Sequence, residues 1–380
     1  MDSYDYIIVG AGAAGLLLAD ALGRDPFFAG HSILLLEKEA NKGNDRTWCF
    51  WETGEGPFDP LLSHSWERLM FAGQAYADRF SIAPYRYKML RGADFYREYE
   101  RRILKAPNIR LLREEVTSIR EKEDWVVVQT RGGKYTASSV FTSLFSWKDL
   151  LAQTRYPVLQ QHFLGWFIRA QSPVFQPEEA TFMDFSVPQK GNTRFMYVLP
   201  FSEREALVEY TLFSPDLLEN VEYEAAIRHY LQNNLKCQEY TILEKEKGRI
   251  PMSCYDFTAR NTNRILHIGV AGGWAKPGTG YTFMNSRRKV CALLDHLKKG
   301  KSLSVFGKRT RFWWYDLLLL DILQRDNAKG RLIFESLFRK RKASLILRFL
   351  DEQTSLWEDL RVIWACPKKD FFMALLRRIF

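Results

Sequence analysis

Two carboxylic acids, Glu209 and Asp184, lie in segments composed almost wholly of apolar residues. Residues 205–213 and 180–187 are predicted strands, and alternation along a strand gives each acid apolar neighbours on its own face. Burial disfavours the charged form of a carboxyl group and so raises its pKa. Such a group can stay protonated near neutral pH and act as a general acid. We therefore treat both residues as candidate acids.

A purely structural role for Glu209 fits the same pattern. Arg194 and Arg169 lie on neighbouring predicted strands, and either could form an ion pair with Glu209 across the sheet. The sequence leaves both roles open.

A glycine motif near the start of the chain has the spacing of a phosphate-binding turn. Gly10, Gly12 and Gly15 follow an apolar strand and open an Ala/Leu-rich helix. This spacing provides a tight turn, close approach of the backbone to a pyrophosphate, and close helix–strand packing. The next strand, 33–37, ends in Glu37, where a ribose hydroxyl is bound in such units. We predict a site for an ADP-containing dinucleotide.

Later segments favour FAD as this dinucleotide. The predicted strands 108–119, 124–130 and 134–143 form a meander, an arrangement typical of FAD enzymes of the glutathione-reductase type. Residues 265–297 then form a strand, a Gly/Pro-rich loop and a helix, a unit that offers N–H groups to an anionic ligand. The loop residues predicted to lie against the isoalloxazine are Gly272, Gly273, Gly278, Thr279 and Gly280.

The segment 44-NDRTWCFWE-52 places aromatic residues directly after the dinucleotide unit. We predict that Arg46 binds the cofactor and that Trp48 and Trp51 form aromatic surface beside the flavin. The alternative is that these aromatic residues are core beneath the cofactor. The 11 Trp and 27 Phe of the whole chain allow the same two interpretations, a large apolar cavity or a densely packed core.

The predicted fold class is α/β, a Rossmann-type FAD-binding domain with an inserted antiparallel β-sheet domain and a helical C-terminal segment. The FAD-binding domain is assigned to residues 1–60, 100–160 and 250–300, the substrate-binding domain to 61–99 and 161–249, and the helical segment to 301–380.

Composition and charge restrict the class of protein further. Five scattered cysteines without a CxxC pair indicate a reducing compartment rather than a disulfide framework or a zinc site. The apolar run 317–320 is far too short to span a bilayer. The net charge is +10, and residues 298–380, with 19 Lys+Arg and 9 Asp+Glu, carry all of it.

Several motifs together resemble the bacterial-type lycopene cyclases. They are NDRTWCFWE (44–52), GWF (165–167), ATFMDF (180–185), FMYVLPFS (195–202), LVEYT (207–211), GRIPM (248–252) and IGVAGGWAKPGTGYTF (268–283). The resemblance runs from residue 4 to about 300 and is weaker beyond.

The resemblance implies a specific reaction. Such an enzyme converts the ψ-ends of lycopene and related acyclic carotenoids to β-ionone rings, through γ-carotene to β-carotene, without net redox change. The family requires reduced FAD, with NAD(P)H as the usual electron donor. Glu209 would protonate the substrate and Asp184 would be its partner in proton return. Tyr210 replaces the second acid of the related plant motif, so a role for that second acid cannot be transferred.

Carbocation chemistry also explains the aromatic segment. Trp48, Trp51 and Trp166 are predicted to stabilise the cation, each desolvated cation–π contact being worth about 2 kcal/mol. Three other activities remain: an FAD-dependent hydroxylase, a prenyl reductase and a non-catalytic carotenoid carrier. The hydroxylase lacks support because its Asp-Gly and Gly-Asp pairs are absent from residues 140–149 and 267–274.

The basic C-terminal segment predicts peripheral binding to an anionic membrane surface, on the cytoplasmic side. The aromatic residues interleaved with its charges are Phe312, Trp313, Trp314, Phe371, Phe372 and Phe380. The cluster 339-RKRK-342 is the predicted centre of this attraction. Nucleic-acid binding is not predicted, because no readout motif accompanies the charge. A solvated helical cap is the alternative, and no oligomeric state is specified.

Overall fold

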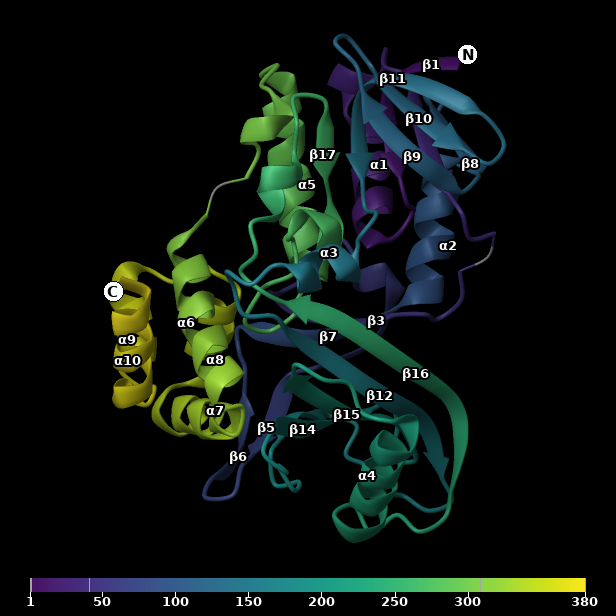
Figure 1. The fold of residues 1–380 in the computed structure, drawn as a ribbon. Helices are drawn as coiled ribbons and strands as arrows, with labels where there is room; N and C mark the ends of the chain where they lie inside the picture. Colours follow the sequence, from purple (N-terminus) through teal and green to yellow (C-terminus); the bar gives the residue numbers. More distant parts are fainter. Residues whose placement is uncertain (1, 41, 308, 380) are drawn as a thin grey trace.

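A mixed sheet, parallel at its centre, carries the glycine motif in the computed structural model, which describes residues 2–40, 42–307 and 309–379 (Figure 1). Its strand order is β8-β2-β1-β11-β10-β9, with β17 paired to β11. Its strands are β1 (Asp2–Val9), β2 (Ile33–Glu37), β8 (Ile109–Arg113), β9 (Val116–Glu121), β10 (Val126–Thr130), β11 (Lys134–Thr142) and β17 (Ile265–His267). The prediction of a dinucleotide unit followed by a hairpin is confirmed by the parallel β1–β2 and antiparallel β10–β11 pairs.

Residues 7–9 of β1 and 33–36 of β2 are apolar because both faces of the sheet are covered there. All five residues of β2 are buried, as is typical of parallel sheets. One face packs on helices and the other is closed by the β9–β11 meander. The covering helices are α1 (Ala13–Arg24), α2 (Gly92–Ile103) and α5 (Phe283–Lys298). Helix α2 thus packs with α1, although most of it falls in a range that we assigned to the substrate domain.

A second seven-stranded sheet forms the inserted domain, in the order β16-β12-β15-β14-β13-β5-β6. Its strands are β5 (Arg68–Ala72), β6 (Ala77–Ser81), β12 (Leu159–Ala170), β13 (Glu179–Asp184), β14 (Thr193–Pro200), β15 (Glu205–Ser214) and β16 (Tyr240–Met252). Helix α4 (Asn220–Asn233) covers one face. The pairing is antiparallel except for β5 with β13. One face packs on α4, and the other packs partly on the C-terminal helices and partly lines a cavity.

A three-stranded sheet joins the two domains, in the order β3-β7-β4. Its strands are β3 (Thr47–Thr53), β4 (Leu62–Trp66) and β7 (Tyr85–Arg91). Figure 1 shows β3 and β7 lying between the N-terminal domain above and the inserted domain below. The segment 44–52 is therefore placed where the two domains meet.

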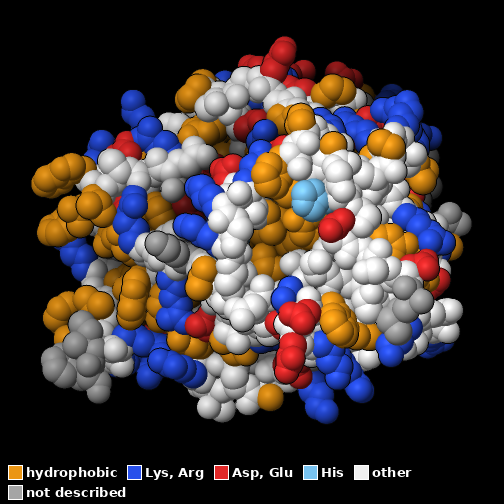
Figure 2. All heavy atoms as spheres, turned by 90° about the horizontal axis from the view of Figure 1, so that it is seen from above, with side chains coloured by type: hydrophobic (Ala, Val, Ile, Leu, Met, Phe, Trp, Pro, Cys, Tyr) orange, Lys and Arg blue, Asp and Glu red, His pale blue; other side chains and the backbone are white. Residues whose placement is uncertain are grey.

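The C-terminal segment is helical, as predicted. Its helices are α6 (Arg311–Arg325), α7 (Lys329–Lys340), α8 (Ala343–Leu350), α9 (Leu356–Ile363) and α10 (Lys368–Ile379). In Figure 2, hydrophobic side chains interleaved with Lys and Arg gather at the left edge, where α9 and α10 lie in Figure 1. Among the described residues, no helix combines the length and apolarity needed to cross a bilayer.

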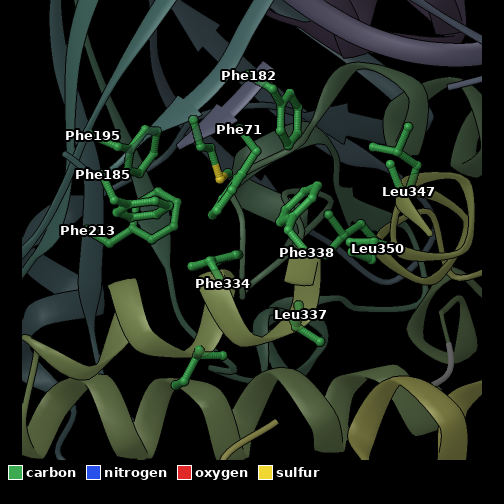
Figure 3. Packing of buried hydrophobic residues seen from close by; sticks show 14 of the residues in the cluster. Phe71, Phe182, Phe185, Phe195, Phe213, Phe334, Leu337, Phe338, Leu347 and Leu350 are labelled. Atoms are coloured by element: carbon green, nitrogen blue, oxygen red, sulfur yellow. The ribbon is translucent and has the colours of Figure 1, made fainter. Parts of the chain in front are cut away.

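Aromatic side chains fill the space between this helical cap and the inserted sheet (Figure 3). Phe338 of α7 stacks on Phe71 at a centroid distance of 4.3 Å, and Phe334 stacks on Phe185 at 5.7 Å. Leu347 and Leu350 extend the same cluster. Much of the high aromatic content is thus packed core, one of the two interpretations that the composition allowed.

Candidate active site

The glycine motif forms a turn that fits a pyrophosphate. Gly10 has φ +95°, and a Cβ there would lie 2.1 Å from Oγ of Ser143. A Cβ on Gly15 would lie 1.9 Å from the carbonyl oxygen of Gly10, so both positions require glycine. By contrast, a Cβ on Gly12 would meet nothing within 4 Å, and Gly12 lines a cavity of about 410 Å³. The backbone at Gly12 is therefore open to a ligand.

Glu37 secures this turn from the end of β2. Its Oε2 accepts hydrogen bonds from the backbone N–H of Ala11 and from Nζ of Lys42, each at 2.6 Å. Burial alone would raise the pKa of Glu37, but the hydrogen bonds from Lys42, Glu39 and Ala11 hold it below its usual value. An anionic acid at this place suits a ribose hydroxyl.

A cavity of about 410 Å³ extends from the glycine turn to the inserted sheet. The predicted site residues that line it are Gly12, Gly15, Arg46, Trp48, Glu209 and Gly280. Three buried polar atoms on its wall have no hydrogen-bond partner among the described residues: Oε1 of Gln161, Oγ of Ser286 and the hydroxyl oxygen of Tyr281. The open turn, the length of the cavity and these unsatisfied atoms fit a dinucleotide that enters from the glycine turn.

A pair of carboxyl groups lies on the opposite wall of this cavity. Glu209 on β15 and Glu246 on β16 are both in register with Gly165 on the strand between them, β12. Gly165 has no side chain, and a Cβ there would lie 3.4 Å from Cβ of Glu209 and 3.3 Å from Cγ of Glu246. The two acids therefore meet above a glycine and share a hydrogen bond.

The environment assigns the shared proton to Glu209. Burial raises the pKa of Glu209 well above its usual value, and the charge and hydrogen bond of Glu246 raise it further. Burial also raises the pKa of Glu246, but the hydroxyl of Thr47, at 2.6 Å, and the charge of Arg91 oppose this. Oε1 of Glu209 accepts a hydrogen bond from the Thr211 hydroxyl at 2.6 Å. Of the two acids, Glu209 thus holds the shared proton more strongly.

Groups that could compete for the proton are kept neutral by burial. Burial raises the pKa of Tyr197, Tyr281 and Cys49, all of which line the cavity. The ion-pair alternative for Glu209 is wrong, because Arg194 pairs with Glu222 and Arg169 with Glu205. Within the described ranges, Glu209 makes no salt bridge.

Most of the Gly/Pro-rich loop, residues 272–280, does not lie where we predicted that it would contact the flavin. Of the loop residues predicted to contact the flavin, only Gly280 lines the 410 Å³ cavity. The other residues of this region that line the cavity are Gly269, Val270, Tyr281 and Thr282. Gly272 and Gly273 line a second cavity of about 210 Å³, because the 3₁₀ turn Gly269–Gly272 bends them away. Gly278 and Thr279 line neither cavity, and Gly278 packs beside Asp316. Contact of these four residues with the flavin is therefore not supported.

Asp184 and Trp166 lie on the wrong face of the inserted sheet for their predicted roles. Asp184 accepts hydrogen bonds from the Tyr230 hydroxyl of α4 at 2.6 Å and from Ser186 N at 2.8 Å. Trp166 is buried in the cluster beneath α4, beside Tyr240. Strand alternation points both away from Glu209. Our expectation that Asp184 is the partner of Glu209 is wrong, and so is that for Trp166 at the cavity.

The two tryptophans of β3 lie in different surroundings, Trp48 at the cavity and Trp51 in the aromatic core. Trp48 lines the cavity and stacks on Phe283 at 5.0 Å. Trp51 points into the aromatic core, where its Nε1 donates to the carbonyl oxygen of Leu347 at 3.1 Å. Its ring meets the edge of Tyr281 at 4.7 Å, so it supports the cavity wall from behind.

Sequence reasoning missed Glu246 and the role of Gly165. The signal was an acidic residue at every second position before GRIPM, in 244-EKEKG-248, which predicts a strand with acids on one face. Nothing local distinguishes Glu246, which is buried, from Glu244, which pairs with Arg91 at 2.6 Å. Only the pairing with β12 separates them.

The fold is the Rossmann-like FAD-binding fold of flavin-dependent oxidoreductases and halogenases. Similar structures include a geranylgeranyl bacteriochlorophyll reductase-like protein from Thermoplasma acidophilum (TM-score 0.61, 12% identity, 96% of each chain covered). A flavoprotein/dehydrogenase from Cytophaga hutchinsonii has a TM-score of 0.59 at 12% identity over 92% of each chain. A halogenase in complex with FAD has a TM-score of 0.57 at 14% identity, covering 92% of this chain and 79% of that one.

A match to a protein family gives a more specific assignment than the fold does. A family model described as "Lycopene cyclase protein" matches residues 5–376, nearly the whole chain. The chain belongs to the lycopene cyclase family. No curated protein sequence gives a significant match. Family and fold together support an enzyme of carotenoid-type biosynthesis.

Proposed function

We propose that the protein is a lycopene β-cyclase, which closes the ψ-ends of lycopene to β-ionone rings by acid–base chemistry without net redox change. The observation that carries this proposal is the carboxyl pair Glu209–Glu246 on the wall of a cavity that begins at a dinucleotide turn. A protonated acid beside an anionic one can give a proton and take one back. Cyclisation requires both steps and consumes nothing.

FAD is the proposed cofactor, with its pyrophosphate at Gly12 and its ribose near Glu37. Arg46 and Trp48 line the cavity beyond the turn, where the isoalloxazine would lie. When bound in its reduced form, FAD would supply an electron-rich ring system that stabilises positive charge. NADH or NADPH is the proposed electron donor, which the rate of flavin reduction by each nucleotide would test.

Glu209 is the proposed acid. It donates its proton to C2 of the terminal double bond, which leaves a tertiary cation at C1, and attack by the C5–C6 double bond closes the ring. Glu246, anionic and held by the Thr47 hydroxyl, is the proposed base that accepts the proton lost from C6. The proton added equals the proton lost, so atoms and electrons balance.

The walls around the pair exclude water and face the cation with aromatic rings. Trp48, Tyr197 and Tyr281 line the cavity, and each desolvated cation–π contact is worth about 2 kcal/mol. The carboxylate of Glu246 attracts the cation more strongly in this buried site than it would in water.

The product of the reaction tests the proposal. Purified protein, reduced FAD and lycopene are combined without oxygen, and the product is analysed by mass and absorption spectrum. An unchanged mass with a changed spectrum supports cyclisation. A gain of two hydrogens would instead establish a prenyl reductase, the alternative suggested by the similar fold of the reductase-like protein. A gain of oxygen would establish a hydroxylase, and an unaltered substrate a carrier.

Flavin content tests the cofactor site separately. Gly12→Val would fill the open space at the turn without straining the backbone, because Gly12 has φ −73°. We expect this variant to fold but to lose its FAD. Gly30→Val is the matched control, since a Cβ at Gly30 also meets nothing within 4 Å but lies outside the cavity. Full flavin content in the Gly12 variant would contradict the assignment.

A further inference from the structure

Helices α9 and α10 present an unusual concentration of exposed apolar side chains. Trp357 of α9 is 79% exposed, and Trp364, the residue that follows α9, is 66% exposed. The two are seven positions apart and so lie on the same side. The other exposed apolar residues of these helices are Leu356, Leu360, Phe372, Met373 and Leu375. We call these seven residues the α9–α10 surface. A concentration of exposed large apolar side chains marks an interaction site.

On these two helices the acidic residues form ion pairs, whereas several basic residues do not. Their acidic residues are occupied: Glu358 pairs with Arg348, Asp359 with Arg311, and Asp370 with Lys329. Asp359 is fully buried. Four exposed basic residues have no acidic partner within the described ranges. They are Arg361, Lys368, Lys369 and Arg377.

Basic and aromatic groups alternate closely on this surface. Nζ of Lys368 lies 4.1 Å from the ring centroid of Trp364, and Arg361 follows Leu360 directly. A partner must therefore accept bulky apolar groups and positive charge side by side. A nucleic acid offers charge and stacking bases but no aliphatic layer for the exposed Leu and Met side chains. An interface of anionic phospholipid offers acyl chains beneath phosphate groups.

We propose that the α9–α10 surface docks on a bilayer containing anionic phospholipid, with the tryptophans in the headgroup region and the four basic residues against lipid phosphates. Helices that lie in a membrane interface have this composition. The docking is peripheral.

This placement differs from the one that the sequence predicted. Of the predicted aromatic residues, Phe312 is buried, while Trp313 and Phe371 pack against the core. Phe380 lies outside the described residues. Only Trp314, on the neighbouring helix α6, and Phe372 are well exposed, at 51% and 59%.

The cluster 339–342 has a structural task that the sequence did not reveal. Nζ of Lys340 donates to the carbonyl oxygen of Ala365, and Nε of Arg341 donates to that of Arg361. Both bonds tie the end of α7 to α9 and to the turn that follows it. Replacing this cluster would loosen the surface as well as remove charge, so it is a poor test of membrane attraction.

Helix α8 lies between the docking surface and the residues that support the cavity wall. Helix α8 packs against α9, and the carbonyl oxygen of Leu347 in α8 accepts the hydrogen bond from Trp51. Trp51 in turn contacts Tyr281 on the cavity wall. The docking surface is thus linked to the cavity wall by direct packing contacts.

Flotation with carotenoid-free vesicles tests the docking independently of any cyclase activity. We expect the full-length protein to float with vesicles of phosphatidylcholine and phosphatidylglycerol, and less with phosphatidylcholine alone. The triple variant Trp357→Ser, Trp364→Ser, Phe372→Ser should lose flotation. The matched control is Trp125→Ser, Leu243→Ser, because these side chains are 49% and 50% exposed in the two sheet domains. It should float like the wild type.

A charge variant separates electrostatic from apolar attraction. Its substitutions are Arg361→Gln, Lys368→Gln, Lys369→Gln and Arg377→Gln. Each lost charge should lower partition to anionic vesicles about fivefold and reduce its salt dependence. The matched control replaces four exposed lysines of the N-terminal domain: Lys105, Lys122, Lys134 and Lys148.

Two results would overturn the proposal. One is equal flotation of the wild type and the triple variant, or no flotation of either. The other is a wild-type dimer that the triple variant converts to a monomer while vesicle binding is absent, which would make this surface a contact between two copies.

Discussion

The two faces of the inserted sheet each bury an acid, and they treat it in opposite ways. On the α4 face, Asp184 accepts two hydrogen bonds from neutral donors, the Tyr230 hydroxyl and Ser186 N. On the cavity face, Glu209 meets a second carboxyl group, Glu246. The first arrangement satisfies a carboxylate and fixes α4 to the sheet. The second forces two acids to share one proton.

The difference shows that burial alone does not identify a catalytic acid. Asp184 is 3% exposed and Glu209 8%, so exposure would rank them in the wrong order. What distinguishes them is the neighbour and the access to a cavity. A perturbed acid that also lines a cavity is a functional candidate, whereas a satisfied one beneath a helix is structural.

The largest expected effect is that of Glu209→Gln. Glutamine keeps the size but cannot donate the proton, so cyclisation should fall by about 10²–10⁴-fold, the usual contribution of a general acid. Flavin content and lycopene binding should be retained, which absorption spectra of the purified variant would check. Near-normal turnover would move the acid role to Asp45, which also lines the cavity, or to the flavin.

Glu209→Gln should also change how the stability of the folded protein depends on pH. The pKa of Glu209 is raised in the folded state, so the wild type binds this proton more tightly folded than unfolded. Its stability should fall as pH rises above the unfolded pKa of about 4.3. Glutamine removes that dependence. Urea midpoints measured across this pH range should therefore favour the variant increasingly towards alkaline pH.

Glu246→Gln should have the next largest effect, about a hundredfold on turnover, because the base is lost. It also carries a signature that general damage would not produce. Without the charge of Glu246 the pKa of Glu209 falls, so the alkaline limb of the pH–rate profile should move to lower pH. An unmoved limb would mean that the two carboxyl groups do not interact in the working enzyme.

Gly165→Ala tests whether the pair depends on the glycine between its members. The added Cβ would lie 2.8 Å from Cδ1 of Leu207 and would press on both acids. We expect a loss of about 1–3 kcal/mol in stability, as for other overpacked sites. Turnover should fall about tenfold, less than the 10²-fold that a 1 Å misplacement can cost. Unchanged turnover would show that the pair tolerates displacement.

Asp184→Ala should have the smallest effect on catalysis. It leaves the buried Tyr230 hydroxyl without an acceptor, which should cost about 1–3 kcal/mol of stability. Turnover of the folded protein should be unchanged. Asp184→Asn is the control, since its amide oxygen can still accept from Tyr230 and should restore stability. A large loss of turnover in the Asn variant would bring Asp184 back as a participant.

Sequence alone determined the elements whose signals are local. The strand–glycine–helix unit follows from Gly10 and Gly15, which admit no side chain, and from the acid at the end of β2. The strands of the inserted sheet and the helical C-terminal segment follow from periodicity. Glu209 was found as a buried acid because apolar residues lie on both sides of it along its strand.

Tertiary structure decided everything that depends on which strand lies beside which. Glu246 becomes the partner of Glu209 only because β12 separates β15 and β16 and carries a glycine at the shared register. The same pairing sends Asp184 and Trp166 to the opposite face. A one-residue shift in register would exchange the two faces, and register is set by contacts between segments far apart in the chain. No local pattern along the sequence contains that information.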